Sequence, residues 1–100
     1  MPALGFGTME YVSGGDPPDA MEAATTGALE AGMRHFDCAE LYESTVHVGK
    51  AFGATKVPRE ELWITSKLKG LPCGDYSAVK ARVEAVRLFT PGGFLARRLA

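Results

Sequence analysis

The feature that most constrains the fold of this chain is a regular alternation between short apolar segments and longer segments of helical composition. The apolar segments indicate strands, and "LWITS", with its β-branched and aromatic residues, is the strongest of them. In chain order, the sequence predicts strands at 2–8, 33–37 and 62–66, each followed by a helix, at 20–31, 45–53 and 77–87. Strands and helices that alternate at this spacing form right-handed crossovers, so the sequence predicts an α/β fold with a parallel sheet.

The first two helices carry signals for their ends and for their packing. Asp19 and Glu22 have the spacing of a capping box, and Gly32 is placed to end the first helix. The second helix is expected to begin after Ser44 as its N-cap. Small side chains form a stripe along the first helix that predicts close packing against the sheet: Ala20, Ala24, Gly27, Ala28 and Ala31.

Composition places the chain among single folded domains and limits its partners. The chain has 100 residues, of which 46% are hydrophobic and 23% charged, as in ordinary globular domains. Residues 1–50 hold two basic and eight acidic residues, a formal charge of −6, whereas residues 51–100 hold nine basic and four acidic residues, a charge of +5. Because these basic residues are scattered without interleaved aromatic residues, we expect no nucleic-acid partner.

The sequence also lacks the signals of export, membrane insertion and metal binding. No apolar run approaches the roughly 18 residues that span a bilayer, and the first residues resemble no signal peptide. The two cysteines form no CxxC pair and have no histidine at the spacing of a zinc site. We therefore expect a cytoplasmic protein with no membrane partner and no metal.

Polar residues stand where each predicted strand ends. Gly7 and Thr8 follow the first strand, Asp37 ends the second with Tyr42 shortly after it, and Lys67 follows the third. The carboxyl ends of parallel strands meet at one edge of a sheet, where functional residues of such folds gather. These residues are therefore expected to lie close together.

An acidic, a phenolic and an ammonium group at one edge could form a tuned general acid. A phenol has a pKa of about 10, and a neighbouring ammonium lowers that value because it favours the phenolate. Lys67 could be this neighbour of Tyr42, and Asp37 would keep the lysine charged and in place. Such an acid suits protonation of a carbonyl oxygen while hydride arrives from a nicotinamide.

The alternatives remain open from spacing alone. Taken singly, Asp37 can be a loop or cap residue, Tyr42 a packing residue and Lys67 a solvated side chain. We expect Cys38 to act as a small buried apolar residue, and His47 to lie on a polar helix face.

Several segments, in this order and spacing, resemble the N-terminal region of the aldo-keto reductase family: "MPALGFGT", "ALEAGMRHFDCAELY", "VGKAF" and "VPREELWITSKL". The resemblance covers residues 2–69 most clearly and extends more weakly to residue 86. It implies a (β/α)₈ TIM barrel that reduces aldehydes and ketones with NADPH and without a metal. The family's catalytic groups are an aspartate, a tyrosine, a lysine and a histidine.

Matching the motifs position by position assigns roles to this chain's residues. By resemblance, Asp37 is the carboxylate, Tyr42 the proton donor and Lys67 the partner that lowers the pKa of the donor. Gly7, Thr8 and Met9, with Asp37, match the segment that lies against the nicotinamide end of the cofactor. The implied cofactor is NADPH and the implied partner is a small carbonyl substrate.

The resemblance stops before the family's fourth strand. The family places its catalytic histidine after that strand, whereas residues 87–100 here read "RLFTPGGFLARRLA" and contain no histidine. We expect residues 1–86 to be the first three βα units of an incomplete barrel, and residues 87–100 to be an irregular, divergent tail. A shifted reading frame, a retained intron, a truncated gene model or a real short product would each produce this pattern.

Three βα units alone would leave unpaired strand edges and an unfilled barrel. We therefore expect an unstable, inactive chain that binds NADPH weakly if at all and self-associates through its sheet edges. A second hypothesis is a non-catalytic fragment that pairs with a full-length paralogue. A flavodoxin-like binding module is disfavoured, because "GTMEYVSGGDPPD" is too long and too rich in proline for a phosphate-binding loop.

Overall fold

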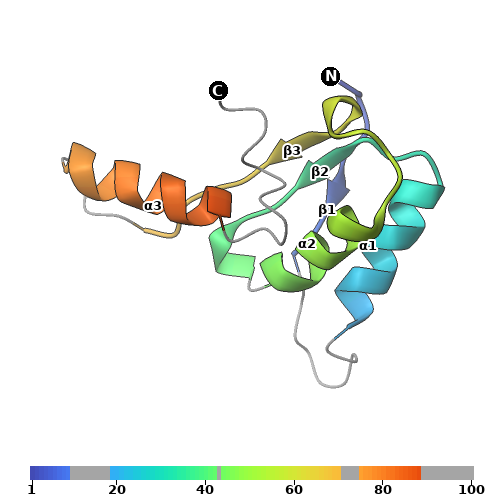
Figure 1. Ribbon diagram of the computed structural model, residues 1–100, viewed down its shortest axis with the longest axis horizontal. Helices are drawn as coiled ribbons and strands as arrows, with labels where there is room; N and C mark the ends of the chain where they lie inside the picture. Colours follow the sequence, from blue (N-terminus) through green and yellow to red (C-terminus); the bar gives the residue numbers. More distant parts are fainter. Residues whose placement is uncertain (10–18, 43, 71–74, 89–100) are drawn as a thin grey trace.

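The computed structural model describes residues 1–9, 19–42, 44–70 and 75–88, and Figure 1 shows how their elements are arranged. In chain order, these are β1 (Phe6–Gly7), α1 (Ala20–Glu30), β2 (His35–Asp37), the 3₁₀ helix η1 (Glu40–Tyr42), α2 (Thr45–Ala54), the 3₁₀ helix η2 (Arg59–Glu61), β3 (Trp63–Thr65) and α3 (Tyr76–Leu88). The predicted tail at 87–100 lies outside the described residues, apart from the two that end α3.

The three strands form one parallel sheet in the order β1, β2, β3. Phe36 of β2 pairs with Phe6 and Ile64, and the next residue, Asp37, pairs with Gly7 and Thr65. The predicted α/β architecture is therefore confirmed. The strands are two or three residues long, shorter than predicted, because an apolar pattern reports burial whereas pairing is limited to positions where the segments align.

One face of the sheet is covered by α1 and α2, which lie side by side in Figure 1. Phe36, Phe52 and Leu62 are at most 1% exposed and form the centre of the core. The Phe36 ring meets Phe6 edge-to-face with centroids 5.9 Å apart, and Phe52 with centroids 5.1 Å apart. The opposite sheet face carries Asp37, since successive residues of a strand point to opposite faces.

The buried face of α1 differs from the predicted stripe of small residues. Ala24, Gly27 and Ala31 are exposed, and the buried positions are Thr25, Ala28 and Leu29. Leu29 gains more from burial than an alanine does, and the Thr25 hydroxyl is satisfied by donating to the Met21 carbonyl at 2.7 Å. The small-residue prediction was therefore wrong at Ala24, Gly27 and Ala31, whereas Ala28 is buried as predicted.

Neither predicted N-cap acts through its side chain. Asp19 precedes α1 and Ser44 precedes α2 as expected, but neither forms a side-chain cap hydrogen bond. The Ser44 hydroxyl is buried and donates instead to the Thr8 carbonyl at 2.6 Å, because that carbonyl lies in the core next to it. The predicted starts of the two helices were therefore correct, but the predicted side-chain capping hydrogen bonds do not form.

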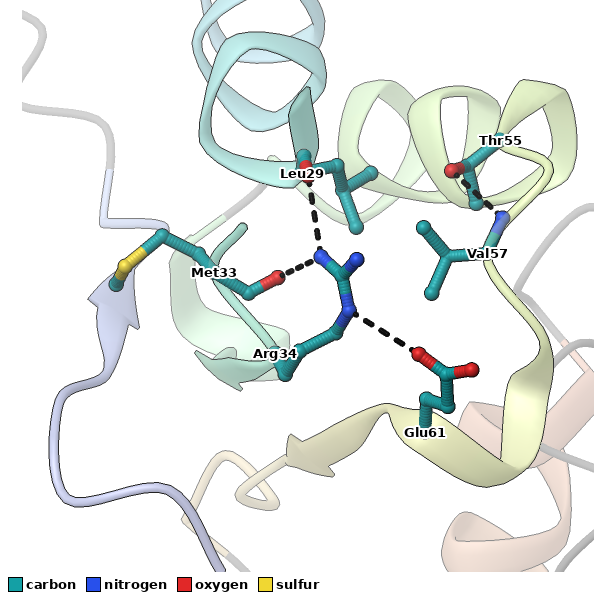
Figure 2. A network of polar contacts seen from close by, with 6 residues as sticks. All are labelled: Leu29, Met33, Arg34, Thr55, Val57 and Glu61. Atoms are coloured by element: carbon teal, nitrogen blue, oxygen red, sulfur yellow. Dashed lines mark hydrogen bonds and ion pairs between the residues drawn. The ribbon is translucent and has the colours of Figure 1, made fainter. Parts of the chain in front are cut away.

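Arg34 ties together the elements at the amino-terminal edge of the sheet (Figure 2). Its Nη1 donates to the carbonyl oxygens of Leu29 at 3.1 Å and Met33 at 2.8 Å, which satisfies the end of α1. Its Nε lies 3.5 Å from the Glu61 carboxylate of η2. The chain reaches Arg34 through Gly32, whose positive φ of 94° suits glycine.

Helix α3 stands away from α1 and α2 in Figure 1. Tyr76 is 79% exposed, and residues 80–85 are exposed without exception. An ion pair between Arg82 of α3 and Glu40 of η1 connects this helix to the segment that follows β2. No helix in the described parts of the chain is both long and apolar enough to cross a membrane.

We expect Phe36→Ala to destabilise the unit by about 3–5 kcal/mol, because it removes a fully buried ring that contacts two others. Hydrogen exchange at the Cys38 and Trp63 amides, which bind β2 to β3, reports the loss. Leu4→Ala is the control, since Leu4 is 70% exposed, and should change stability by less than about 0.5 kcal/mol. Equal protection in both variants would contradict a core centred on Phe36.

Candidate active site

The backbone of Asp37 is held firmly at the carboxyl edge of the sheet. Thr8, which is fully buried, donates both its N–H and its hydroxyl to the Asp37 carbonyl, each at 3.0 Å. Ser44 in turn holds the Thr8 carbonyl. This chain of hydrogen bonds joins the ends of β1 and β2 to the start of α2 and fixes where the Asp37 side chain begins.

The three predicted catalytic residues meet at this edge. The Lys67 ammonium donates to Oδ1 of Asp37 at 2.6 Å, and the Tyr42 hydroxyl lies 3.5 Å from Oδ2 of the same carboxylate. The Lys67 Nζ also lies 5.1 Å from the centre of the Tyr42 ring. Residues up to 30 positions apart in sequence therefore form one cluster around a single carboxylate.

The carboxylate sets the charge of this cluster. The hydrogen bond that Lys67 donates to Asp37, and a smaller contribution from Tyr42, raise the pKa of Lys67 above its ordinary value of 10.5. The ammonium is therefore charged throughout the neutral range, and it loses its charge, and with it the ion pair, as pH rises through the raised pKa of Lys67. Both side chains are nearly half exposed, at 47% and 45%, so water screens their attraction.

Cys38 follows Asp37 directly but is not prepared for nucleophilic chemistry. Burial is the main cause that raises the pKa of its thiol, and a neutral thiol is a poor nucleophile. Its backbone N–H donates to the Thr65 carbonyl at 2.8 Å and so extends the pairing of β2 with β3. The sequence-based interpretation of Cys38 as a packing residue agrees with this environment.

The segment predicted to face the cofactor lies beside the cluster. Gly7 is exposed, and among the described residues nothing lies within 4 Å of where a side chain would begin. Met9 is 57% exposed, whereas Thr8 is buried and its hydroxyl donates a hydrogen bond to the Asp37 carbonyl. The open space at Gly7, next to its strand partner Asp37, leaves room for a flat group, and the buried Thr8 holds the Asp37 backbone.

Two residues organise the site in ways that the sequence did not predict: Ser44, which was expected only as an N-cap, and Glu40. Glu40 accepts the Lys69 N–H at 3.0 Å through Oε2 and binds Arg82 through Oε1, while its own N–H donates to the Lys67 carbonyl at 3.0 Å. Its partners lie 29 and 42 residues away, so no local pattern could reveal them.

His47 was expected on a polar face of its helix. It is instead partly buried, and its Nδ1 has no hydrogen-bond partner among the described residues.

A groove of about 600 Å³ lies near the amino-terminal ends of the strands. It is bounded by the carboxyl-terminal halves of α1 and α2 and by the segment before β3. Arg34 and Glu61 line it, but they are bonded to each other, as Figure 2 shows. The groove and the Asp37 cluster lie at opposite strand ends. Among the described residues, no group of three or more His, Cys, Asp or Glu side chains could hold a metal ion.

We expect Asp37→Asn to lower the pKa of Lys67 toward its ordinary value, because the carboxylate is the largest cause of the raised pKa. A ¹H–¹³C NMR titration of the lysine Cε groups measures the change. Glu22→Gln is the matched control, since it removes a carboxylate paired with Lys50 at 3.9 Å on the helices. A Lys67 pKa that Asp37→Asn leaves unchanged would contradict the ion pair.

Comparison with solved structures places these elements in a known architecture. The structure superposes on an aldo-keto reductase from a Medee basin deep-sea metagenome library with a TM-score of 0.71 and 32% identity, over 92% of this chain and 31% of that one. It also matches the Bombyx mori aldo-keto reductase, solved in complex with NADP, with a TM-score of 0.63 and 34% identity, over 69% and 24%. These neighbours are (β/α)₈ barrels, and the three parallel units are consistent with an incomplete N-terminal portion of such a barrel.

Curated relatives give the same result. The chain is 44% identical over 73 residues to mouse aldo-keto reductase family 1 member A1, and spans 21% of that protein's length. It is 36% identical over 86 residues to the Mycobacterium avium aldo-keto reductase, covering 86% of this chain and 28% of that protein. A sequence model of the Aldo/keto reductase family matches residues 3–87, and the chain belongs to this family.

Proposed function

We propose that the chain contributes to the NADPH-dependent reduction of aldehydes or ketones to alcohols, with Asp37, Tyr42 and Lys67 as its catalytic residues. The observation that carries this proposal is the convergence of the Tyr42 and Lys67 side chains on the Asp37 carboxylate at the carboxyl ends of the strands. The solved relative with bound NADP supports the choice of cofactor. Gly7, Thr8 and Met9, with Asp37, form the part of the cofactor site that this chain supplies.

Tyr42 is the proton donor in this proposal. Its hydroxyl transfers a proton to the carbonyl oxygen of the substrate as that oxygen gains negative charge. NADPH, when bound, supplies the hydride that reduces the carbonyl carbon. The nearby Lys67 ammonium stabilises the phenolate that remains on Tyr42, and Asp37 holds the ammonium in place through its 2.6 Å contact.

We further propose that this chain alone is inactive and binds NADPH weakly if at all. It spans about a fifth of the mouse relative's length and supplies three of the four catalytic groups that the family resemblance implies. Its two histidines, His35 and His47, lie on β2 and α2 rather than after a fourth strand. Turnover therefore requires further barrel strands that complete the site.

The test joins residues 1–86 to the later strands of the Mycobacterium avium relative, which aligns over 86 residues. We expect NADPH oxidation with a broad-range aromatic aldehyde in the completed barrel, and none with the isolated chain. Tyr42→Phe should lower turnover in the completed barrel by about 10²–10⁴-fold, because it removes the proton donor.

Tyr76→Phe is the matched control, because Tyr76 is exposed on α3 and its loss should leave turnover unchanged. Equal turnover with Tyr42→Phe and Tyr76→Phe would contradict the assignment of Tyr42. Activity of the isolated chain that Tyr42→Phe abolishes would support the site and contradict the need for further strands.

A second candidate function is that of an interaction fragment. In the described part of the chain, β1 and β3 each pair with β2 alone, so each leaves one edge of backbone groups unpaired. An unpaired edge is a template for pairing with another chain. The partner would be a second copy or a larger reductase-like chain.

We expect the mass of the purified chain, measured by light scattering after size exclusion, to rise with concentration through edge pairing. Thr65→Lys places a charge on the exposed side of β3 and should raise the concentration at which association begins. Thr26→Lys is the control, because it adds the same charge to an exposed position of α1. A monomeric mass with a cooperative thermal transition would contradict self-association and instability together.

A further inference from the structure

Glu40 connects three parts of the chain around the candidate active site. It lies between Asp37 and Tyr42 in the loop after β2, at the start of η1. Its backbone N–H donates to the Lys67 carbonyl at 3.0 Å, and its Oε2 accepts the Lys69 N–H at 3.0 Å. It therefore holds the segment after β3 at two points, one at Lys67 itself and one two residues later.

We propose that Glu40 is the positioning residue that sets Lys67 against the Asp37 carboxylate and Tyr42, with Arg82 of α3 holding the Glu40 carboxylate in place. The inference deepens the proposed function, on which it rests, because it assigns the group that assembles the same three catalytic residues. Glu40 does not contact the reacting groups through its side chain. Its effect passes through the backbone of residues 67–69.

The need for such a residue follows from the exposure of the catalytic ion pair. A solvated pair between Lys67 and Asp37 contributes little free energy, and a free lysine side chain samples many conformations. Fixing the backbone on both sides of residue 68 reduces those conformations before the ammonium meets Asp37. The distance between Nζ and Oδ1 then depends on the loop rather than on the weak attraction alone.

The position of Arg82 explains how the Glu40 carboxylate keeps its direction. The Glu40 side chain is 26% exposed, less than either partner of the Glu22–Lys50 pair, which are 37% and 53% exposed. Arg82 binds Oε1 and leaves Oε2 for the Lys69 N–H, so both carboxylate oxygens are used. The otherwise exposed helix α3 is thereby joined to η1, which carries Glu40 and Tyr42.

The test measures the pKa of Lys67 by NMR in the 100-residue chain, without cofactor or substrate. Glu40→Ala removes both side-chain bonds, and we expect the Lys67 pKa to fall toward its ordinary value as the ammonium leaves Asp37. Arg82→Met, on exposed α3 and away from the core, should lower it in the same direction. Exchange of the Lys69 amide should become faster in both variants.

Glu40→Gln separates positioning from charge. It removes the negative charge but keeps one amide oxygen, which can accept the Lys69 N–H and cannot at the same time accept from Arg82, so we expect the Lys67 pKa to fall as in Arg82→Met and less than in Glu40→Ala. A Lys67 pKa that falls equally in Glu40→Gln and Glu40→Ala would mean a charge effect and overturn the proposal. Glu22→Gln, which removes a charge from the helices, should leave the pKa unchanged.

Two further results would overturn the proposal: an ordinary Lys67 pKa in the wild-type chain, or an unchanged pKa in Glu40→Ala while Asp37→Asn lowers it. Neither depends on turnover. The proposed function is tested by activity of the completed barrel, so its failure and that of the Glu40 inference are distinguishable.

Discussion

The register of β2 between its two neighbours is the constraint on which both the core and the site depend. Phe36 and Asp37 are consecutive, so they point to opposite faces of the sheet. Phe36 fills the space beneath α1 and α2, while Asp37 reaches Lys67 and Tyr42. A slip of one residue would place a carboxylate in the core and a phenylalanine beside Lys67 and Tyr42, so the core and the polar cluster select the same pairing.

The site combines a rigid backbone with solvated side chains. Thr8 and Ser44 are buried and hydrogen-bonded, and they fix the Asp37 backbone. Asp37 and Lys67 themselves remain nearly half exposed. Electrostatic interactions gain strength where water is excluded, and water reaches both of these side chains in this structure. The three side chains are therefore brought together by a buried backbone while their charged groups stay in contact with water.

The sequence was sufficient for the order and type of the main elements, because apolar periodicity and helix signals are local. It was also sufficient to bring Asp37, Tyr42 and Lys67 to one edge, since parallel strands align their carboxyl ends. It failed where long-range packing decides: the buried face of α1 follows Leu29 and Thr25, and the Ser44 hydroxyl serves Thr8 rather than α2. The two 3₁₀ helices, and the role of Glu40, depend on contacts that no neighbouring residues specify.

The Arg34 network at the amino-terminal edge has a consequence for protein engineering. Arg34 joins α1, the start of β2 and η2 through Leu29, Met33 and Glu61, and among the described residues this network shares no hydrogen bond or ion pair with the Asp37 cluster. Sites that share no partner and lie apart contribute to stability nearly additively. A designer can therefore reinforce the amino-terminal ends of the strands, for example at the α1–β2 turn, and independently exchange the loops at their carboxyl ends.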